Sequence, residues 1–297
     1  MKTITPTAAN ESSDATYLDV RLLDDYQHSH IAGAVSNCVF EVAFTDRLEG
    51  ATPDKDAIYI VYGANEKSKE AEMAIEKMER LGYTNLTLLE GGYTAWTAAD
   101  LPTEGTGDPP AEPNIPEGTH QLDLGQSYLM WTGRNLLNNH NGRVGIKSGE
   151  VEIKDGKLTG GRFVIDMTNI WCNDLQGDAH DGLISHLKSH DFFDVEHHPE
   201  AVLEIRSAKA IEDAPPGTQN LIITGDLTLK GKTAPVELAA VAGVTPEKQL
   251  AAQSSFLIDR TVWNVLYGSG KLFSRVGMHL VNDLVDIEVK AVTLPPS

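Results

Sequence analysis

The sequence predicts two folded domains: an α/β domain with a parallel sheet and flanking helices, followed by an all-β antiparallel barrel with a short helical flap. Residues 17–103 alternate short apolar strands with a helix, and residues 103–116 are rich in Pro and Gly. After residue 118, most segments alternate apolar and polar side chains. We therefore expect an α/β domain at residues 1–104, a linker at 105–117 and a barrel at 118–297.

The elements of the α/β domain follow from short apolar runs and one amphipathic segment. Strands are predicted at Thr16–Arg21, Ile58–Tyr62 and Leu86–Leu89. Ser68–Leu81 carries apolar residues at three- and four-residue spacing, which predicts a helix, and Gly82 can adopt the left-handed conformation that ends it. Short connections between strand, helix and strand favour a parallel sheet covered by helices.

Four motifs in this domain together resemble those of rhodanese-like domains. They are L-D-V-R at Leu18–Arg21, Y-x-x-x-H-I-A-G-A at Tyr26–Ala34, the strand end Val61-Tyr62, and L-E-G-G-Y-x-x-W at Leu89–Trp96. Active members of the family carry a cysteine directly after the V-Y strand, where loop amides and a helix N-terminus lower the thiol pKa and hold a persulfide.

This chain has no cysteine in the corresponding loop, which reads Gly63, Ala64, Asn65, Glu66, Lys67 and Ser68. The resemblance therefore implies a catalytically inactive domain that serves as a docking or regulatory module. We expect Ser68 to cap the following helix, with a residual anion-binding role for Lys67 and Ser68 as the alternative. A sulfurtransferase-type or phosphatase-like enzyme with an unusual active loop stays open as the second hypothesis for the protein.

The barrel is predicted from strands with one apolar and one polar face, joined by turn signals such as Asp155-Gly156 and Gly231-Lys232. The expected strands are Gln121–Leu124, Tyr128–Arg134, Gly142–Lys147, Gly149–Lys154, Arg162–Met167, Ala201–Ser207, Leu221–Leu229, Pro235–Val241, Ala251–Ile258 and Leu284–Val292. Leu183, Ile184 and Leu187 predict a short helical flap between two of them. So many strands are best closed into a barrel, which leaves no exposed edge.

Motifs spread through the barrel segment closely resemble the YceI-like family. They are G-G-x-F-x-x-D-M at Gly160–Met167, H-L-K-S-x-D-F-F-D at His186–Asp194, H-P-x-A at His198–Ala201, G-D-L-T-L-K-G at Gly225–Gly231 and I-D-R-T-x-W at Ile258–Trp263. The resemblance covers about three-fifths of the chain. It implies a lipocalin-like barrel that binds a polyisoprenoid, an isoprenoid quinone or a similar amphiphilic lipid, for sequestration or transport.

Alternation alone favours a packed barrel core, whereas the resemblance favours a cavity. The predicted ligand-binding residues are Trp131, His140, Phe163, Ile165, Leu187, Phe192, Phe193, Leu203, Phe256, Ile258, Arg260, Trp263 and Tyr267. Phe192 and Phe193 are expected near the mouth. His140 is expected to contact a ligand headgroup, and Arg260 either to contact the headgroup or to close the barrel. No cofactor is expected beyond the bound lipid or quinone.

Five histidines between His180 and His198 raise the alternative of a metal site, because His186 and His190 have the i, i+4 spacing that places two ligands on one helix face. The segment lacks H-E-x-x-H, so we expect surface histidines and no metal. The only cysteines, Cys38 and Cys172, are expected as unpaired thiols, with an interdomain disulfide as the alternative.

Composition limits the partners. The net charge is −19, which excludes nucleic acid as a partner and opposes binding to anionic membranes. No run approaches the roughly 20 apolar residues that span a bilayer, and the N-terminal residues lack the apolar core of a signal peptide. We therefore expect a cytoplasmic protein with a lipid ligand and a protein partner for the rhodanese-like domain. A homodimer stays open.

Overall fold

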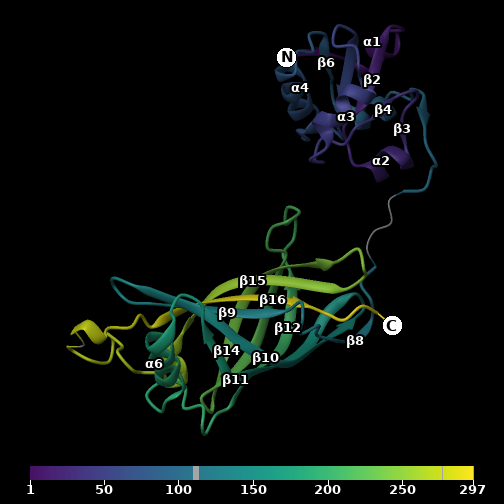
Figure 1. The fold of residues 1–297 in the computed structure, drawn as a ribbon. Coiled ribbons are helices and arrows are strands. Elements are labelled where there is room, and N and C mark those ends of the chain that lie inside the picture. The colour runs from purple at the N-terminus through teal and green to yellow at the C-terminus, as the bar shows by residue number, and fades with distance from the viewer. Residues whose placement is uncertain (110–113, 276, 297) are drawn as a thin grey trace. The chain divides into compact units, whose positions relative to one another are not determined.

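The computed structural model describes residues 1–109, 114–275 and 277–296, which form two compact units, Met1–Glu112 and Pro113–Ser297 (Figure 1). We call them the α/β unit and the barrel unit. Part of the predicted linker, residues 110–113, lies outside the described residues.

The α/β unit is built on a five-stranded parallel sheet with strand order β1-β6-β5-β2-β4. Its strands are β1 Lys2–Ile4, β2 Ala15–Asp19, β4 Val35–Ser36, β5 Ile58–Tyr62 and β6 Leu86–Leu89. Two short strands, β3 His30–Ile31 and β7 Thr103–Glu104, pair antiparallel beside it. The helices are α1 Pro6–Asn10, α2 Leu23–His28, α3 Phe44–Ala51, α4 Glu70–Arg80 and α5 Gly92–Ala98. The predicted fold class of this domain is confirmed.

Helix α4 packs its apolar face into the core of the α/β unit, where Ala74, Ile75 and Met78 are almost fully buried. The helix ends as expected, because Gly82 adopts φ +92° directly after it. The prediction that Ser68 caps it is wrong. The capping position is Lys69, and no side chain accepts a hydrogen bond there; Ser68 is bonded within its own loop instead.

The barrel unit is a closed barrel of eight antiparallel strands. The ring runs β11-β12-β13-β14-β15-β16-β9-β10 and closes through the pairing of β10 with β11. Its strands are β9 Tyr128–Arg134, β10 Asn139–Lys154, β11 Lys157–Cys172, β12 Glu200–Ala210, β13 Leu221–Leu229, β14 Lys232–Val244, β15 Leu250–Asp259 and β16 Leu284–Val292. A short strand, β8 Gly118–Gln121, pairs with the far part of β10. The predicted antiparallel barrel is confirmed.

Several barrel strands are longer than expected, β11 by five residues at each end, and two further differences concern β10 and the first strand. Gly142–Lys147 and Gly149–Lys154 belong to one continuous strand, β10. The break in alternation between them coincides with a shift of register against β11. The first strand lies at Gly118–Gln121 instead of Gln121–Leu124. The hairpin signal at Asp155-Gly156 is confirmed, with φ of +51° and +67°, the signs that a tight type I′ turn requires.

Three of the connections between strands lie at one end of the barrel, the left-hand end in Figure 1. They are the β9–β10 loop at residues 135–138, the segment with helix α6 Gly177–Lys188 between β11 and β12, and residues 260–283 between β15 and β16. The last segment contains the short 3₁₀ helices η1 Arg260–Trp263 and η2 Gly277–His279. We call this the mouth end.

Candidate functional site

The barrel encloses a cavity of about 500 Å³, within the range of sites that hold a small amphiphile. Side chains from all eight strands line it, because the inward-facing residues of each strand point into the barrel. The structure places twelve of the thirteen predicted site residues on the cavity wall: Trp131, His140, Phe163, Ile165, Leu187, Phe192, Phe193, Leu203, Phe256, Ile258, Arg260 and Tyr267.

Trp263 is the predicted site residue that does not line the cavity. It is 3% exposed, and its indole N–H donates to the Leu227 carbonyl over 2.8 Å. Strand alternation suggested an inward position, but β15 ends at Asp259 and the chain then turns through η1. Trp263 therefore belongs to the packed core under the mouth end, together with Leu229 and Val265.

Aromatic side chains from the flap and from the β15–β16 segment cover the cavity at the mouth end. The His186 ring makes edge contacts with Phe192 and Tyr267, with ring centroids 5.2 and 4.5 Å apart. Phe193 packs edge-on against Phe192 at 5.9 Å. These four residues all line the cavity, so they form an aromatic cover over the ligand space.

Arg260 holds the β15–β16 segment in place and closes the barrel. Its side chain is 2% exposed and donates to three backbone carbonyls, those of Val265, Val281 and Asn282, over 2.6 to 3.0 Å. Asp283, also buried, balances the charge at 3.4 Å. Of the two predicted roles, the contacts are those of barrel closure, because the guanidinium donors are directed at the protein backbone.

Two polar atoms of the cavity wall are buried without a hydrogen-bond partner among the described residues: Trp131 Nε1 and His186 Nε2. A buried polar atom without a partner is costly, so each one calls for an explanation, and a bound molecule is one of them. The indole N–H can only donate. A ligand that satisfies Trp131 must therefore offer an acceptor such as a carbonyl, hydroxyl or phosphate oxygen.

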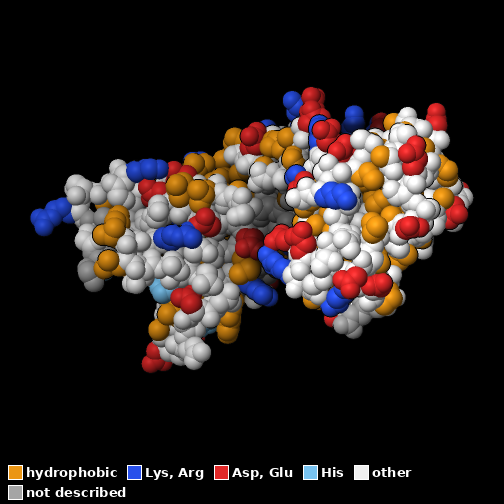
Figure 2. All heavy atoms as spheres, turned by 90° about the horizontal axis from the view of Figure 1, so that it is seen from above, with side chains coloured by type: hydrophobic (Ala, Val, Ile, Leu, Met, Phe, Trp, Pro, Cys, Tyr) orange, Lys and Arg blue, Asp and Glu red, His pale blue; other side chains and the backbone are white. Residues whose placement is uncertain are grey.

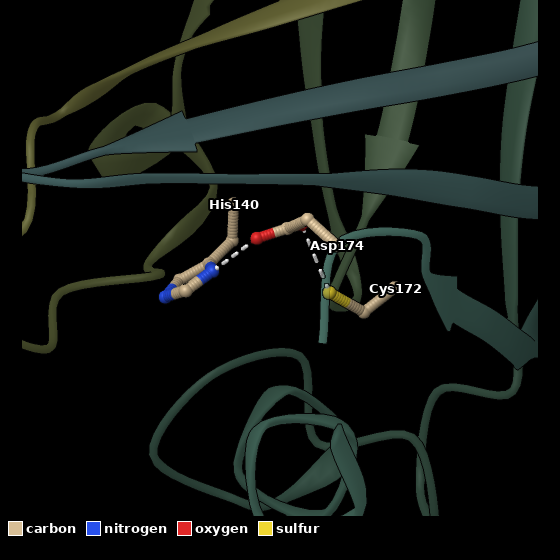
Figure 3. Close-up of side chains that lie close together, drawn as sticks. All are labelled: His140, Cys172 and Asp174. Atoms are coloured by element: carbon tan, nitrogen blue, oxygen red, sulfur yellow. Dashed lines mark hydrogen bonds and ion pairs between the residues drawn. The ribbon is translucent and has the colours of Figure 1, made fainter. Parts of the chain in front are cut away.

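His140 lies at the mouth end in a polar cluster with Asp174 and Cys172 (Figure 3). His140 Nδ1 is 2.8 Å from Asp174 Oδ2, and the Cys172 thiol donates to Asp174 Oδ1 over 3.3 Å. Burial alone would raise the pKa of Asp174, but the Asn141 N–H, His140 and Cys172 outweigh it and lower the pKa to about 2. Burial raises the pKa of Cys172, so this thiol is neutral at pH 7.

The same three side chains are the one group of three candidate metal ligands found in the described residues, with their ligand atoms all within 4.8 Å of one another. His, Cys and Asp are a donor set that suits zinc. In this arrangement, however, Asp174 already accepts hydrogen bonds from the other two, which joins the ends of β10 and β11 without a metal. We assign the cluster a structural role.

No group of candidate ligands forms within His180–His198 among the described residues. His190 is 87% exposed, and it and His197 pair with Asp194 at 3.3 and 2.9 Å. Hydrogen bonding to Asp194 raises the pKa of His197. His186 instead faces the cavity. The i, i+4 pair therefore does not converge on one site.

Sequence reasoning missed His186 as a cavity residue and missed the role of Asp174. A signal existed for His186, because it lies between Leu183 and Leu187 on the apolar face of α6. None existed for Asp174, whose partner His140 is 34 residues away in the sequence. The two thiols are free and buried as expected.

In the α/β unit, the loop at residues 63–68 is bonded to itself. The N–H groups of Lys67 and Ser68 donate to the side chain and carbonyl of Asn65, and the Asn65 N–H donates to Ser68 Oγ. A Cβ on Gly63 would lie 2.9 Å from Glu70 Oε2, which is buried without a partner among the described residues. A carboxylate oxygen thus lies beside the position where an active member carries its cysteine.

The two units together define the class: an α/β domain of rhodanese-like topology joined to a lipocalin-like barrel with an apolar cavity. Residues 120–293 match the family model of the YceI-like domain, and residues 6–99 match that of the rhodanese-like domain. The chain belongs to the YceI-like family, with a rhodanese-like domain at its N-terminal side.

Solved structures resemble each unit separately. BcnA of Burkholderia cenocepacia is 21% identical, with 58% of this chain and 99% of that chain covered and a TM-score of 0.46. A polyisoprenoid binding domain from Saccharophagus degradans is 13% identical over 60% of this chain and 98% of its own, at 0.45. The rhodanese-like domain of the Anabaena sp. Alr3790 protein is 26% identical over 38% and 86%, at 0.33.

A comparison with curated proteins gives no match. Among the described residues, no helix is both long and apolar enough to cross a membrane.

Proposed function

We propose that the barrel unit binds a polyisoprenoid, an isoprenoid quinone or a similar lipid, and sequesters or carries it. The observation that carries this proposal is the cavity of about 500 Å³ with a wall of mainly apolar side chains. A packed barrel would fill this space with its own side chains. Membership of the YceI-like family supports a lipid as the ligand.

The unpartnered Trp131 Nε1 favours a lipid with an oxygen-bearing head over a pure hydrocarbon. Placing an acceptor beside the indole N–H would recover a hydrogen bond worth about 1 kcal/mol. A quinone carbonyl and a polyprenol hydroxyl both provide one. The tail would occupy the apolar part of the cavity between residues such as Phe163, Leu203 and Phe256.

For the rhodanese-like domain we propose a docking or regulatory role without sulfur transfer. Gly63 provides no thiol, and three amides of the loop at residues 63–68 are already bonded within the loop. The sulfurtransferase alternative lacks the nucleophile and the open anion site that the mechanism needs. A thiosulfate:cyanide assay on the full chain tests this, with Cys38→Ser as the variant that removes the single thiol of the α/β unit.

The decisive experiment identifies the ligand and its head together. Native mass spectrometry and organic extraction of the untagged protein from its own host should give a discrete isoprenoid species. The lipid-free protein is then titrated with an isoprenoid quinone and with squalene, a hydrocarbon without an oxygen. Trp131→Phe should weaken quinone binding about fivefold and leave squalene binding unchanged.

Two results would contradict the proposal. One is a protein that carries no extractable lipid and binds neither probe. The other is a Trp131→Phe variant that loses both probes equally, since this would mean that the indole fills space in the wall and does not recognise a head.

A further inference from the structure

Two loops at the mouth end present pairs of neighbouring hydrophobic side chains to solvent. Leu136 and Leu137 on the β9–β10 loop are 85% and 80% exposed, and Leu272 and Phe273 in the β15–β16 segment are 53% and 48% exposed. Single exposed apolar residues are ordinary, but groups of them on protruding loops are typical of surfaces that contact a membrane or another protein. We call these four residues the apolar tips.

The apolar tips lie beside the cavity opening. Asn135 and Asn138, which flank Leu136 and Leu137, line the cavity, as does Tyr267 on the other segment. The two segments are joined directly, because the Asn282 N–H donates to the Arg134 carbonyl over 2.8 Å. Both are at the left-hand end of the barrel in Figure 1. A surface in contact with the tips would thus face the route into the cavity.

The charge around the tips differs from that of the rest of the chain. About one residue in seven of the protein is acidic, 43 in 297. Residues 124–149 and 261–282 contain no Asp or Glu, and they carry Arg134, Arg143, Lys147, Lys271 and Arg275. Figure 2 shows hydrophobic and basic side chains at this left-hand end, with some acidic side chains among them. The two segments that carry the tips are therefore free of acidic residues, whereas the α6 segment at the same end carries Asp178, Asp181 and Asp194.

The bases near the tips are partly paired with acids behind them. Lys271 is 2.6 Å from Asp259, and Arg134 pairs with Asp286. The bases near the tips are accordingly partly neutralised and offer lipid phosphates only a weak attraction. Exposed leucine and phenylalanine side chains on segments without acidic residues fit the headgroup–acyl boundary of a bilayer, into which such side chains insert.

We propose that the apolar tips dock the barrel on a lipid bilayer, so that its ligand passes between membrane and cavity without crossing water. Docking stands on the tips alone, whereas the passage of ligand rests on the proposed function. The whole-chain charge suggested no affinity for anionic membranes; that average conceals two segments free of acids.

The test measures docking first, in flotation assays of the lipid-free full chain with vesicles of phosphatidylcholine, alone or with some phosphatidylglycerol. We expect the wild-type protein to float with both, and Leu136→Ser/Leu137→Ser and Leu272→Ser/Phe273→Ser each to lower the partition coefficient about tenfold. The matched control is Leu257→Ser, on the outer wall at β15 and 56% exposed, which should float like wild type.

A second assay measures the uptake of an isoprenoid quinone from vesicles and from detergent micelles. The tip variants should take it up more slowly from vesicles and equally from micelles, because none of the four residues lines the cavity. A wild-type protein that does not float, or tip variants that float like wild type, would overturn the docking proposal. Flotation that depends on the tips, without quinone uptake in either assay, supports docking and contradicts the proposed ligand.

Discussion

The loop at residues 63–68 and the mouth of the barrel differ in whether their polar groups have hydrogen-bond partners. In the loop, three backbone amides are bonded to Asn65 and Ser68, members of the same loop. At the mouth, Trp131 Nε1 and His186 Nε2 are buried in a cavity wall without a partner among the described residues. The loop amides have partners within the loop, although the neighbouring Glu70 Oε2 has none among the described residues, whereas the mouth combines two unpartnered polar atoms with an apolar cavity.

This difference shows that an intact fold and an intact binding site have to be judged separately. The α/β unit keeps a well-packed core around Ile75 and Met78, so its fold is intact although its loop is closed on itself. A fold can persist as a recognition scaffold after its chemistry is lost. The contacts of the individual polar groups are therefore a better guide to a working site than the fold that surrounds them.

The largest effect is expected at Arg260, which keeps the mouth in shape. Arg260→Met removes the donors of three buried carbonyls and the partner of the buried Asp283, which should lower the free energy of unfolding by about 3 kcal/mol. Urea denaturation measures it. Arg206→Met, whose guanidinium pairs with Asp226 at the surface, is the control and should cost under about 1 kcal/mol. Equal losses would mean that Arg260 does not organise the mouth.

The next effect tests whether the barrel is hollow. Ala240 is 1% exposed and lines the cavity, so Ala240→Phe should fill it and weaken isoprenoid quinone binding about a hundredfold, with the midpoint of thermal unfolding nearly kept. Ala239→Phe, one position along β14 and directed away from the cavity, should bind as wild type. A large loss of stability in Ala240→Phe without a loss of binding would indicate a packed barrel.

The fold was predictable because its signals are local. Alternation in β9 to β16 and the spacing of α4 need only neighbouring residues, and both predict the elements, although β10 is predicted as two strands and the shorter helices of the α/β unit are not predicted. Most of the cavity wall followed from the same alternation together with the family resemblance. Trp263 was misplaced because alternation was extended past the end of β15, where a 3₁₀ turn changes the direction of the side chains.

The remainder depends on contacts between distant residues. Asp174 contacts His140 only when the ends of β10 and β11 come together. That Trp131 Nε1 lacks a hydrogen-bond partner among the described residues can be seen only once the positions of the surrounding atoms are known. Likewise, Ser68 lies shortly before α4 at a position typical of a helix cap, yet its hydroxyl is hydrogen-bonded to the backbone N–H and carbonyl of Asn65. The preference of serine for helix N-caps does not show that a loop backbone will take its hydroxyl instead.

A smaller effect is expected from restoring a thiol to the closed loop. Gly63→Cys should fold with a loss of about 1 kcal/mol, because the new Cβ meets only the movable ends of Glu70 and Ser68. It should still give no thiosulfate:cyanide activity above wild type, since Asn65 and Ser68 hold the loop amides away from an anion. Activity in this variant would show that the loop opens readily, and the contrast with the barrel mouth would fail.

The smallest effect concerns Asp174, whose pKa is lowered to about 2 in the folded protein from an ordinary 3.8. A lowered pKa stabilises the fold at pH values above 3.8, and this stabilisation is lost as the pH falls through 2. Because the Asp174 side chain is 32% exposed, solvent screening reduces this stabilisation of the fold to about 1 kcal/mol. Asp174→Asn should therefore be less stable than wild type by about that amount at pH 6.

Urea denaturation between pH 6 and strongly acidic conditions follows this difference, which should shrink toward zero as wild-type Asp174 becomes protonated. Glu247→Gln is the control, an exposed carboxylate for which the described residues provide no hydrogen-bond partner. A difference that stays constant with pH would mean that Asp174 acts by shape and not by charge. The His140–Asp174–Cys172 cluster would then be a neutral hydrogen-bonded joint between β10 and β11, while the mouth beside it would still be open to a ligand.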